Sequence, residues 1–322
     1  MRLAPAVRHA AVFLLAVVAT ARADGPSAPA VTADQAVEET RQDDDGRIVL
    51  SARTATVDGS TAKLESDPGN QRIGLWTNPA DTVSWIWQPT RWGVYDARLT
   101  YSSAAQSGSE IEVAVGDTPL TCRLESTGDW NRYASLPLGR VVIPTTAEFT
   151  IRVRCTKLVG NAVMNLKAIT LTPTCEGIPP RQAADGMVTL HGRDATVRGT
   201  TLRWEPAEKK QTLGFWTRPT DAAEWTFTLD APGPFDVEVL QGCGTGQGGS
   251  EMAIDVDRDR SNGCTLAFTV EDTGGFQAFK PRTVGRVTID ATGDHTLRVQ
   301  PKKIAKTAAC DIRQMRLVPV EK

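Results

Sequence analysis

The sequence predicts an all-β protein built from two tandem antiparallel β-sandwiches. Three observations lead to this prediction. Short segments alternate apolar and polar residues with a period of two, which is typical of half-buried strands. Turn residues interrupt these segments about every 8 to 12 positions, as in sandwiches and jelly rolls. A unit of about 130 residues occurs twice, and each copy has the length of a domain.

The repeat is visible without gaps between residues 47–85 and 187–225, where 15 of 39 positions are identical. Both segments contain the pattern Gly-x-Trp-Thr-x-Pro-x-Asp-x-x-x-Trp. Further matches follow in the same order, including LGRVVI with VGRVTI and NLKAITLTP with DIRQMRLVP. We therefore place repeat 1 at residues 47–174 and repeat 2 at residues 187–320. Residues 175–186 are the predicted linker, which its two adjacent prolines keep short and stiff.

The strand that closes this pattern has a predicted core face in both repeats. The faces consist of Val83, Trp85 and Trp87 in repeat 1 and of Ala223, Trp225 and Phe227 in repeat 2. A buried indole removes ~150 to 250 Å² from water, so the central tryptophans are expected in the core. Gly74 and Gly214 are expected at a close backbone approach. Asp81 and Asp221 are expected to cap the turn before the strand.

The N-terminus resembles an export signal. Two arginines precede an apolar stretch at residues 10–19, and residues 21–23, Ala-Arg-Ala, fit the small-x-small cleavage rule. We expect residues 1–23 to be a signal peptide, with an uncleaved anchor as the alternative. The apolar stretch is too short to span a bilayer, so no membrane insertion is expected. Residues 24–46 are rich in Ala, Pro and acidic residues and are predicted to be a disordered leader.

Charge and cysteine content limit the partners. Removal of the signal peptide takes away three arginines and no acids, which leaves 33 basic and 38 acidic residues and a net charge of −5. Nucleic-acid binding needs clustered Lys and Arg, so we exclude nucleic acid as a partner. The six cysteines of a secreted, periplasmic or envelope protein can form disulfides, and 15 pairings remain open.

Few residues are suited to catalysis. Only His191 and His295 remain after the signal peptide, and neither lies near a Ser or Cys motif. Glu110 and Glu251 recur in the two repeats, but both begin alternating segments, where a solvated strand edge is the simpler interpretation. We therefore expect no enzyme, with glycoside hydrolysis by paired carboxylates as a remote alternative.

The repeated phrases resemble carbohydrate-binding modules of families 6 and 35, which are galactose-binding-like jelly rolls. The family's vGy…gDwv.y phrase is similar to IGLWTNPADTVSW, and its tGgWqty phrase is similar to TGDWNRY. Its Gly-Tyr-turn strand and closing N…I.L strand are similar to WGVYDARLTYSS and NLKAITL. The resemblance covers nearly all of each repeat. It implies a non-catalytic protein that binds a glycan or polysaccharide, and it suggests a secreted glycosidase or sulfatase, or an envelope protein, as a partner.

In this family aromatic rings stack on the sugar, and an Asn near the last strand bonds its hydroxyls. By position, the resemblance implies the following carbohydrate-binding residues: Trp76, Trp130, Tyr133 and Asn165, with Asn161 as a second amide, in repeat 1, and Trp216, Phe276, Phe279 and Asp311 in repeat 2. The sequence leaves alternatives open. Trp76 and Trp216 either face a ligand or plug the sandwich end. Trp130 and Phe276 either stack on sugar or pack over a turn, and Asn165 either binds sugar or satisfies backbone.

The family usually holds a structural Ca²⁺ through acidic residues of its first strand. Here Arg53 and Arg193 occupy those places, so we expect no calcium, no other metal and no cofactor. The DVDRDRSNG segment imitates the start of a calcium-binding loop, but its sixth and twelfth positions are Arg260 and Leu266. We expect a long hairpin turn there instead.

The features together predict a secreted, non-catalytic protein that binds carbohydrate through two modules. Duplication suits binding, because two weak sites gain through effective concentration. The alternative is a structural or adhesion protein of the cell envelope, whose sandwiches contact other proteins. In that case the rim aromatics would be buried against neighbouring loops.

Overall fold

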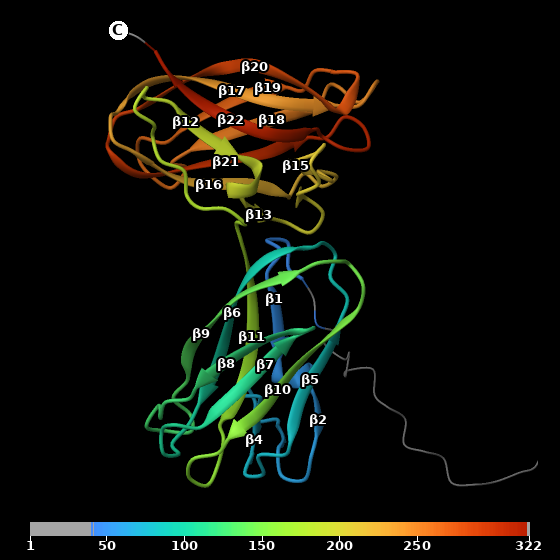
Figure 1. The fold of residues 1–322 in the computed structure, drawn as a ribbon, viewed down its shortest axis with the longest axis vertical. Helices are drawn as coiled ribbons and strands as arrows, with labels where there is room; N and C mark the ends of the chain where they lie inside the picture. The colour runs from blue at the N-terminus through green and yellow to red at the C-terminus, as the bar shows by residue number, and fades with distance from the viewer. Residues whose placement is uncertain (1–39, 41, 321–322) are drawn as a thin grey trace, which may run out of the picture. The chain divides into compact units, whose positions relative to one another are not determined.

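The computed structural model describes residue 40 and residues 42–320. The predicted signal peptide and most of the predicted leader lie outside the described residues. Four antiparallel sheets form two β-sandwiches, one in each half of the chain (Figure 1). The predicted all-β class with tandem sandwiches is confirmed.

Repeat 1 pairs a six-stranded sheet with a five-stranded one. The larger sheet has the order β3 (Lys63–Glu65), β4 (Arg72–Gly74), β11 (Asn165–Thr174), β6 (Gly93–Ser102) and β9 (Ala134–Ile143), with β1 (Ile48–Ser51) also paired to β11. The smaller sheet has the order β2 (Thr56–Asp58), β5 (Thr82–Trp87), β10 (Phe149–Lys157), β7 (Glu110–Val115) and β8 (Thr118–Arg123).

Repeat 2 has the same topology, strand for strand. Its larger sheet runs β14 (Arg203–Glu205), β15 (Thr212–Gly214), β22 (Asp311–Pro319), β17 (Gly233–Cys243) and β20 (Gly275–Ile289), with β12 (Val188–His191) on β22. Its smaller sheet runs β13 (Thr196–Arg198), β16 (Ala222–Leu229), β21 (Gly293–Lys303), β18 (Glu251–Val256) and β19 (Cys264–Thr269). Short 3₁₀ turns, Ala52–Thr54 and Gly192–Asp194, follow the first strand of each repeat. The duplication seen in the sequence is therefore also present in the topology.

Each sandwich encloses one hydrophobic core, and the predicted inward faces are buried. Val83, Trp85 and Trp87 of β5 lie in the first core, and Ala223, Trp225 and Phe227 of β16 lie in the second. The two central indoles also find the same kind of partner. Trp85 donates to Ser51 O at 2.9 Å, and Trp225 donates to His191 O at 2.8 Å. A buried tryptophan thus satisfies its single polar atom in both repeats.

Asp81 and Asp221 have a longer-range role than the predicted turn cap. Each carboxylate accepts backbone N–H groups about twenty residues upstream, from residues 60–62 and from residues 200–202. Burial alone would raise the pKa of Asp81, but these N–H donors lower it below its ordinary value. Gly199, with φ of 139°, passes so close that a Cβ would lie 2.4 Å from Asp221 Cγ, so only glycine fits there.

Two connecting segments are ordered where the structure describes them. Gln42 forms a bridge with Ile48 and donates to Tyr95 Oη at 3.1 Å, so the last residues of the predicted leader contact repeat 1. In the linker, the N–H groups of Glu176 and Gly177 both donate to Arg193 O. These hydrogen bonds join the linker to the 3₁₀ turn of repeat 2.

The Asp-rich segment of repeat 2 is the predicted hairpin turn, since it joins the paired strands β18 and β19. Both carboxylate oxygens of Asp257 have partners within the fold: Oδ2 lies 2.6 Å from His295 Nδ1, and Oδ1 accepts from Thr296 N.

All six cysteines are free thiols in the structure, which shows no disulfide. The part of the chain that the structure describes contains no helix that could span a bilayer.

Candidate functional site

Each sandwich has a pocket near the start of its last strand. The repeat 1 pocket measures about 360 Å³ and is lined by Glu65, Arg72, Leu75, Trp76, Thr77, Trp130, Ala162, Met164 and Asn165. The repeat 2 pocket measures about 270 Å³ and is lined by Glu205, Lys210, Phe215, Thr217, Phe276, Gln277, Thr307, Ala308 and Asp311. Matching positions of the duplicated sequence line both, namely Glu65 and Glu205, Leu75 and Phe215, Thr77 and Thr217, Trp130 and Phe276, Ala162 and Ala308, and Asn165 and Asp311. An equivalent pocket is therefore present in both repeats.

A hydrophobic side chain on strained backbone stands at each pocket. Leu75 and Phe215 follow the ends of β4 and β15 and have φ values of 54° and 60°. The left-handed region costs a residue other than glycine about 1 to 2 kcal/mol. Burial does not offset this cost, because Leu75 is 51% exposed and Phe215 is 43% exposed. Backbone strain of this kind is typical of functional sites.

The glycines before these residues relieve a close approach by a carboxylate, not by backbone. A Cβ on Gly74 would lie 2.0 Å from Glu65 Oε2, and a Cβ on Gly214 would lie 2.5 Å from Glu205 Oε2. Any side chain at these positions would push the carboxylate out of the pocket wall. The glycines therefore shape the sites directly.

A charge pair forms part of each pocket wall. Arg72 Nε lies 2.9 Å from Glu65 Oε2, and Lys210 Nζ lies 2.5 Å from Glu205 Oε1. The cation comes from different positions in the two repeats, because Arg72 aligns with Thr212. Each pair places donors beside acceptors, an arrangement that suits hydroxyl groups, which both donate and accept.

Trp76 and Trp216 are fully buried, with 0% exposure of each residue. Trp216 donates to Asp221 O at 2.9 Å, which fixes the ring inside the sandwich end. Trp76 lies beneath the repeat 1 pocket as part of its floor. Burial of both rings favours the plug alternative, although Trp76 also borders the repeat 1 pocket. The stacking role of the two residues remains a prediction.

Trp130 is a half-buried ring at the repeat 1 pocket, and its main chain is held from two sides. Its carbonyl oxygen accepts from Ser102 Oγ at 2.5 Å and from Asn165 Nδ2 at 2.9 Å. Ser102 and Asn165 are cross-strand neighbours in β6 and β11. Asn165 thus satisfies backbone, as one alternative stated, and at the same time positions the Trp130 turn at the pocket.

The equivalent turn of repeat 2 has neither the serine hydroxyl nor the amide. Gly242 and Asp311 are the cross-strand pair in β17 and β22 that corresponds to Ser102 and Asn165. Burial and the nearby Glu205 carboxylate raise the pKa of Asp311 to about 7, against the opposing influence of Lys210. Near neutral pH, Asp311 therefore changes between an acid that can donate and a carboxylate that only accepts.

Three other predicted residues do not line the pockets. Lys167 Nζ lies 4.5 Å from the centre of the Tyr133 ring, and Arg313 Cζ lies 3.9 Å from the centre of the Phe279 ring. A basic side chain thus covers each of these rings. Asn161 is exposed outside the repeat 1 pocket. The structure brings together Trp130 and Asn165 in one site and Phe276 and Asp311 in the other.

Sequence reasoning missed the charge pairs and the strained residues Leu75 and Phe215. The only sequence signal for the strained pair is an apolar residue between Gly and Trp in both repeats.

The remote catalytic candidates are Glu110 and Glu251. Both are solvent-exposed and lie 3.2 and 4.0 Å from lysines of neighbouring strands. Among the described residues, no group of three or more His, Cys, Asp or Glu could hold a metal ion.

No protein-family model and no curated protein matches this sequence. Among solved structures, the chain is similar to a family 35 carbohydrate-binding module from Clostridium thermocellum, at 14% identity over 39% of this chain and 96% of that one, with a TM-score of 0.34. It is also similar to the C-terminal family 6 module of the laminarinase LamC from Zobellia galactanivorans, at 15% identity over 39% and 98%, with a TM-score of 0.32. A Paenibacillus xanthan lyase aligns at 16% identity over 85% of this chain and 26% of the lyase, with a TM-score of 0.36.

Proposed function

We propose that this protein binds carbohydrate without catalysis, through one site in each repeat, after export from the cytoplasm. The observation that carries the proposal is the equivalent pocket of the two repeats. Each pocket combines a half-buried aromatic ring, an exposed apolar side chain and a charge pair. A sugar ring has apolar faces that pack against such side chains and hydroxyls that need paired donors and acceptors.

In repeat 1, the ring of Trp130 supplies the stacking surface, and Leu75 supplies a second apolar contact. The Glu65–Arg72 pair faces the sugar hydroxyls. In repeat 2, the smaller ring of Phe276 takes the stacking role, while Phe215 offers a larger apolar contact than its counterpart. The two sites therefore differ in their preferred sugar.

Binding is favoured over hydrolysis because of where the carboxyl groups lie. Glycoside hydrolysis needs two carboxyl groups on either side of the scissile bond. Glu205 Oε2 and Asp311 Oδ1 both lie close to Gly214, at 2.5 and 3.2 Å from the position of an added Cβ. They occupy the same wall of the pocket, and Lys210 neutralises Glu205. Repeat 1 has an amide, Asn165, in place of the second acid.

The test is retention of the purified protein on a panel of immobilised polysaccharides, with Trp130→Ala and Phe276→Ala made singly and together. Each single change should weaken its own site by ~1 to 3 kcal/mol, on the scale of base stacking on aromatic side chains. The double variant should lose retention. Ile86→Ala is the matched control, because Ile86 is 66% exposed and lines none of the pockets described.

Folded wild-type protein that no polysaccharide retains would overturn the proposal. Co-purification of a protein partner together with such a result would favour the adhesion alternative. Release of reducing sugar by the wild type, lost in Glu205→Gln, would favour hydrolysis.

A further inference from the structure

A second hollow lies beside the repeat 2 pocket, where residues before β6 meet repeat 2. Arg91, which is 2% exposed, donates from Nε to Gly199 O at 2.9 Å and from a terminal nitrogen to Val197 O at 3.0 Å. Trp92 donates from its indole to Trp204 O at 2.9 Å. These contacts to main-chain acceptors, made by the buried Arg91 and the half-buried Trp92, hold the Trp92 ring in place.

The Trp92 ring is continuous with the repeat 2 site. The centres of the Trp92 and Phe215 rings are 5.7 Å apart in an edge-to-face arrangement. Arg203 Cζ lies 4.0 Å from the Trp92 ring centre and 3.7 Å from the Phe215 ring centre. Phe215 is itself a lining residue of the repeat 2 pocket. The Arg203 side chain covers one face of each ring, and the three side chains form a continuous surface from that pocket to Trp92.

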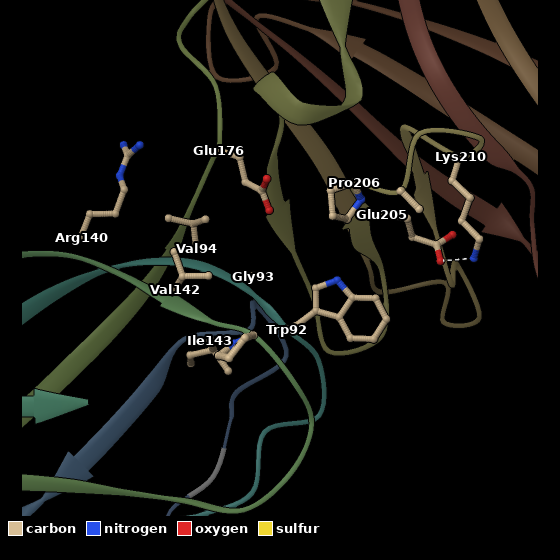
Figure 2. Close-up of a pocket in the computed structure, with 12 residues that line it drawn as sticks. Trp92, Gly93, Val94, Arg140, Val142, Ile143, Glu176, Glu205, Pro206 and Lys210 are labelled. Carbon is tan, nitrogen blue, oxygen red and sulfur yellow. Dashed lines mark hydrogen bonds and ion pairs between the residues drawn. The ribbon is translucent and has the colours of Figure 1, made fainter. Parts of the chain in front are cut away.

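The hollow at Trp92, here called the junction cleft, measures about 700 Å³, more than twice the volume of the repeat 2 pocket. Its walls include Trp92, Val94, Val142 and Pro206, with Arg140 and Glu176 at the polar positions (Figure 2). Figure 2 also shows the Glu205–Lys210 pair at one side of the cleft. Both members of this pair line the junction cleft and the repeat 2 pocket, so one charge pair borders the two cavities.

We propose that a glycan chain bound at the repeat 2 pocket continues over the Glu205–Lys210 pair and along Trp92 into the junction cleft. The inference rests on the proposed function and adds to it that the repeat 2 site takes an oligosaccharide or polysaccharide segment. The chemistry of the cleft matches the next sugar units. It offers apolar surface for ring faces and both signs of charge for hydroxyls, in a volume typical of ligand sites.

The test is a series of soluble oligosaccharides of increasing length, cut from a polysaccharide that retains the protein. Binding is measured by calorimetry in the Trp130→Ala background, so that only repeat 2 reports. We expect affinity to rise with chain length. Val142→Arg should remove that rise, by on the order of tenfold for the longest chain, and leave the shortest ligand unaffected. Val142 is 57% exposed, so this change is compatible with folding.

Ala207→Trp, at a cleft-lining residue that belongs to repeat 2, should have the same effect, and Ile86→Arg should have none. The extension is overturned if short sugars bind at repeat 2 but affinity does not rise with length. It is equally overturned if both cleft variants keep the full rise. Binding of no sugar of any length would instead refute the proposed function, and the extension with it.

Discussion

Asp311 shows how one substitution between the repeats changes the chemistry of a site. Its counterpart Asn165 carries an amide that donates to the Trp130 carbonyl at every pH. Asp311 is buried beside Glu205, and its pKa of about 7 lies well above the ordinary value of 3.8. The folded protein thus holds a proton through a pH range in which the unfolded chain has lost it.

The raised pKa of Asp311 makes the free energy of unfolding depend on pH. The contribution of Asp311 to stability is fully present below about pH 4 and is lost as the pH rises to about 7. Asp311→Asn should remove this contribution, so wild-type stability should fall by a few kcal/mol more than variant stability over that range. Chemical denaturation of both proteins at several pH values measures the difference. Parallel stability curves would contradict the raised pKa.

Asp81 illustrates a buried carboxylate with the opposite shift. Three backbone N–H groups, from residues 60–62, depend on it. Asp81→Ala should destabilise repeat 1 by roughly 3 kcal/mol or more, since buried donors lose a charged acceptor. The unfolding free energy from urea titration measures this loss, with Asp117→Ala in an exposed turn as the control. A loss no larger than that of the control would rule out the proposed role.

At the scale of elements, the strands were predictable and the pocket rims were not. Period-two alternation located the core faces of β5 and β16, because burial on one side of a sheet dictates that pattern. No sequence period predicts the positive φ of Leu75 and Phe215, since this depends on the direction in which the chain continues after β4 and β15. The sequence likewise does not decide whether Trp76 is buried, because this depends on loops far away in the sequence.

The strained loops carry a prediction in which stability and binding move in opposite directions. Leu75→Gly should leave the free energy of unfolding unchanged or raise it by about 1 kcal/mol, because glycine adopts positive φ without strain. The same change should weaken retention on polysaccharide, because it removes the exposed apolar contact. Denaturation and retention are measured on one preparation. A clear loss of stability without any loss of binding would show that Leu75 has a structural role only.

At the scale of the whole molecule, two sites on one chain raise the affinity of the protein for a polymer. A polysaccharide presents many copies of its repeating unit, so engagement of one site raises the effective concentration at the other. Wild-type protein should bind the polymer on the order of a hundredfold more tightly than a variant in which one site no longer binds. A short oligosaccharide should show no such gain. Equal ratios for polymer and short ligand, measured by calorimetry and retention, would mean that the sites act alone.

The buried cysteine thiols report the local opening of each sandwich without any mutation. Cys155 in the first sandwich and Cys310 in the second are buried, and burial raises the pKa of both thiols. Alkylating reagents attack the ionised sulfur, so each cysteine reacts only when its surroundings open. Peptide mass spectrometry during alkylation would then time the opening of each half within the same molecules. A ligand bound to one half should slow alkylation of the cysteine in that half.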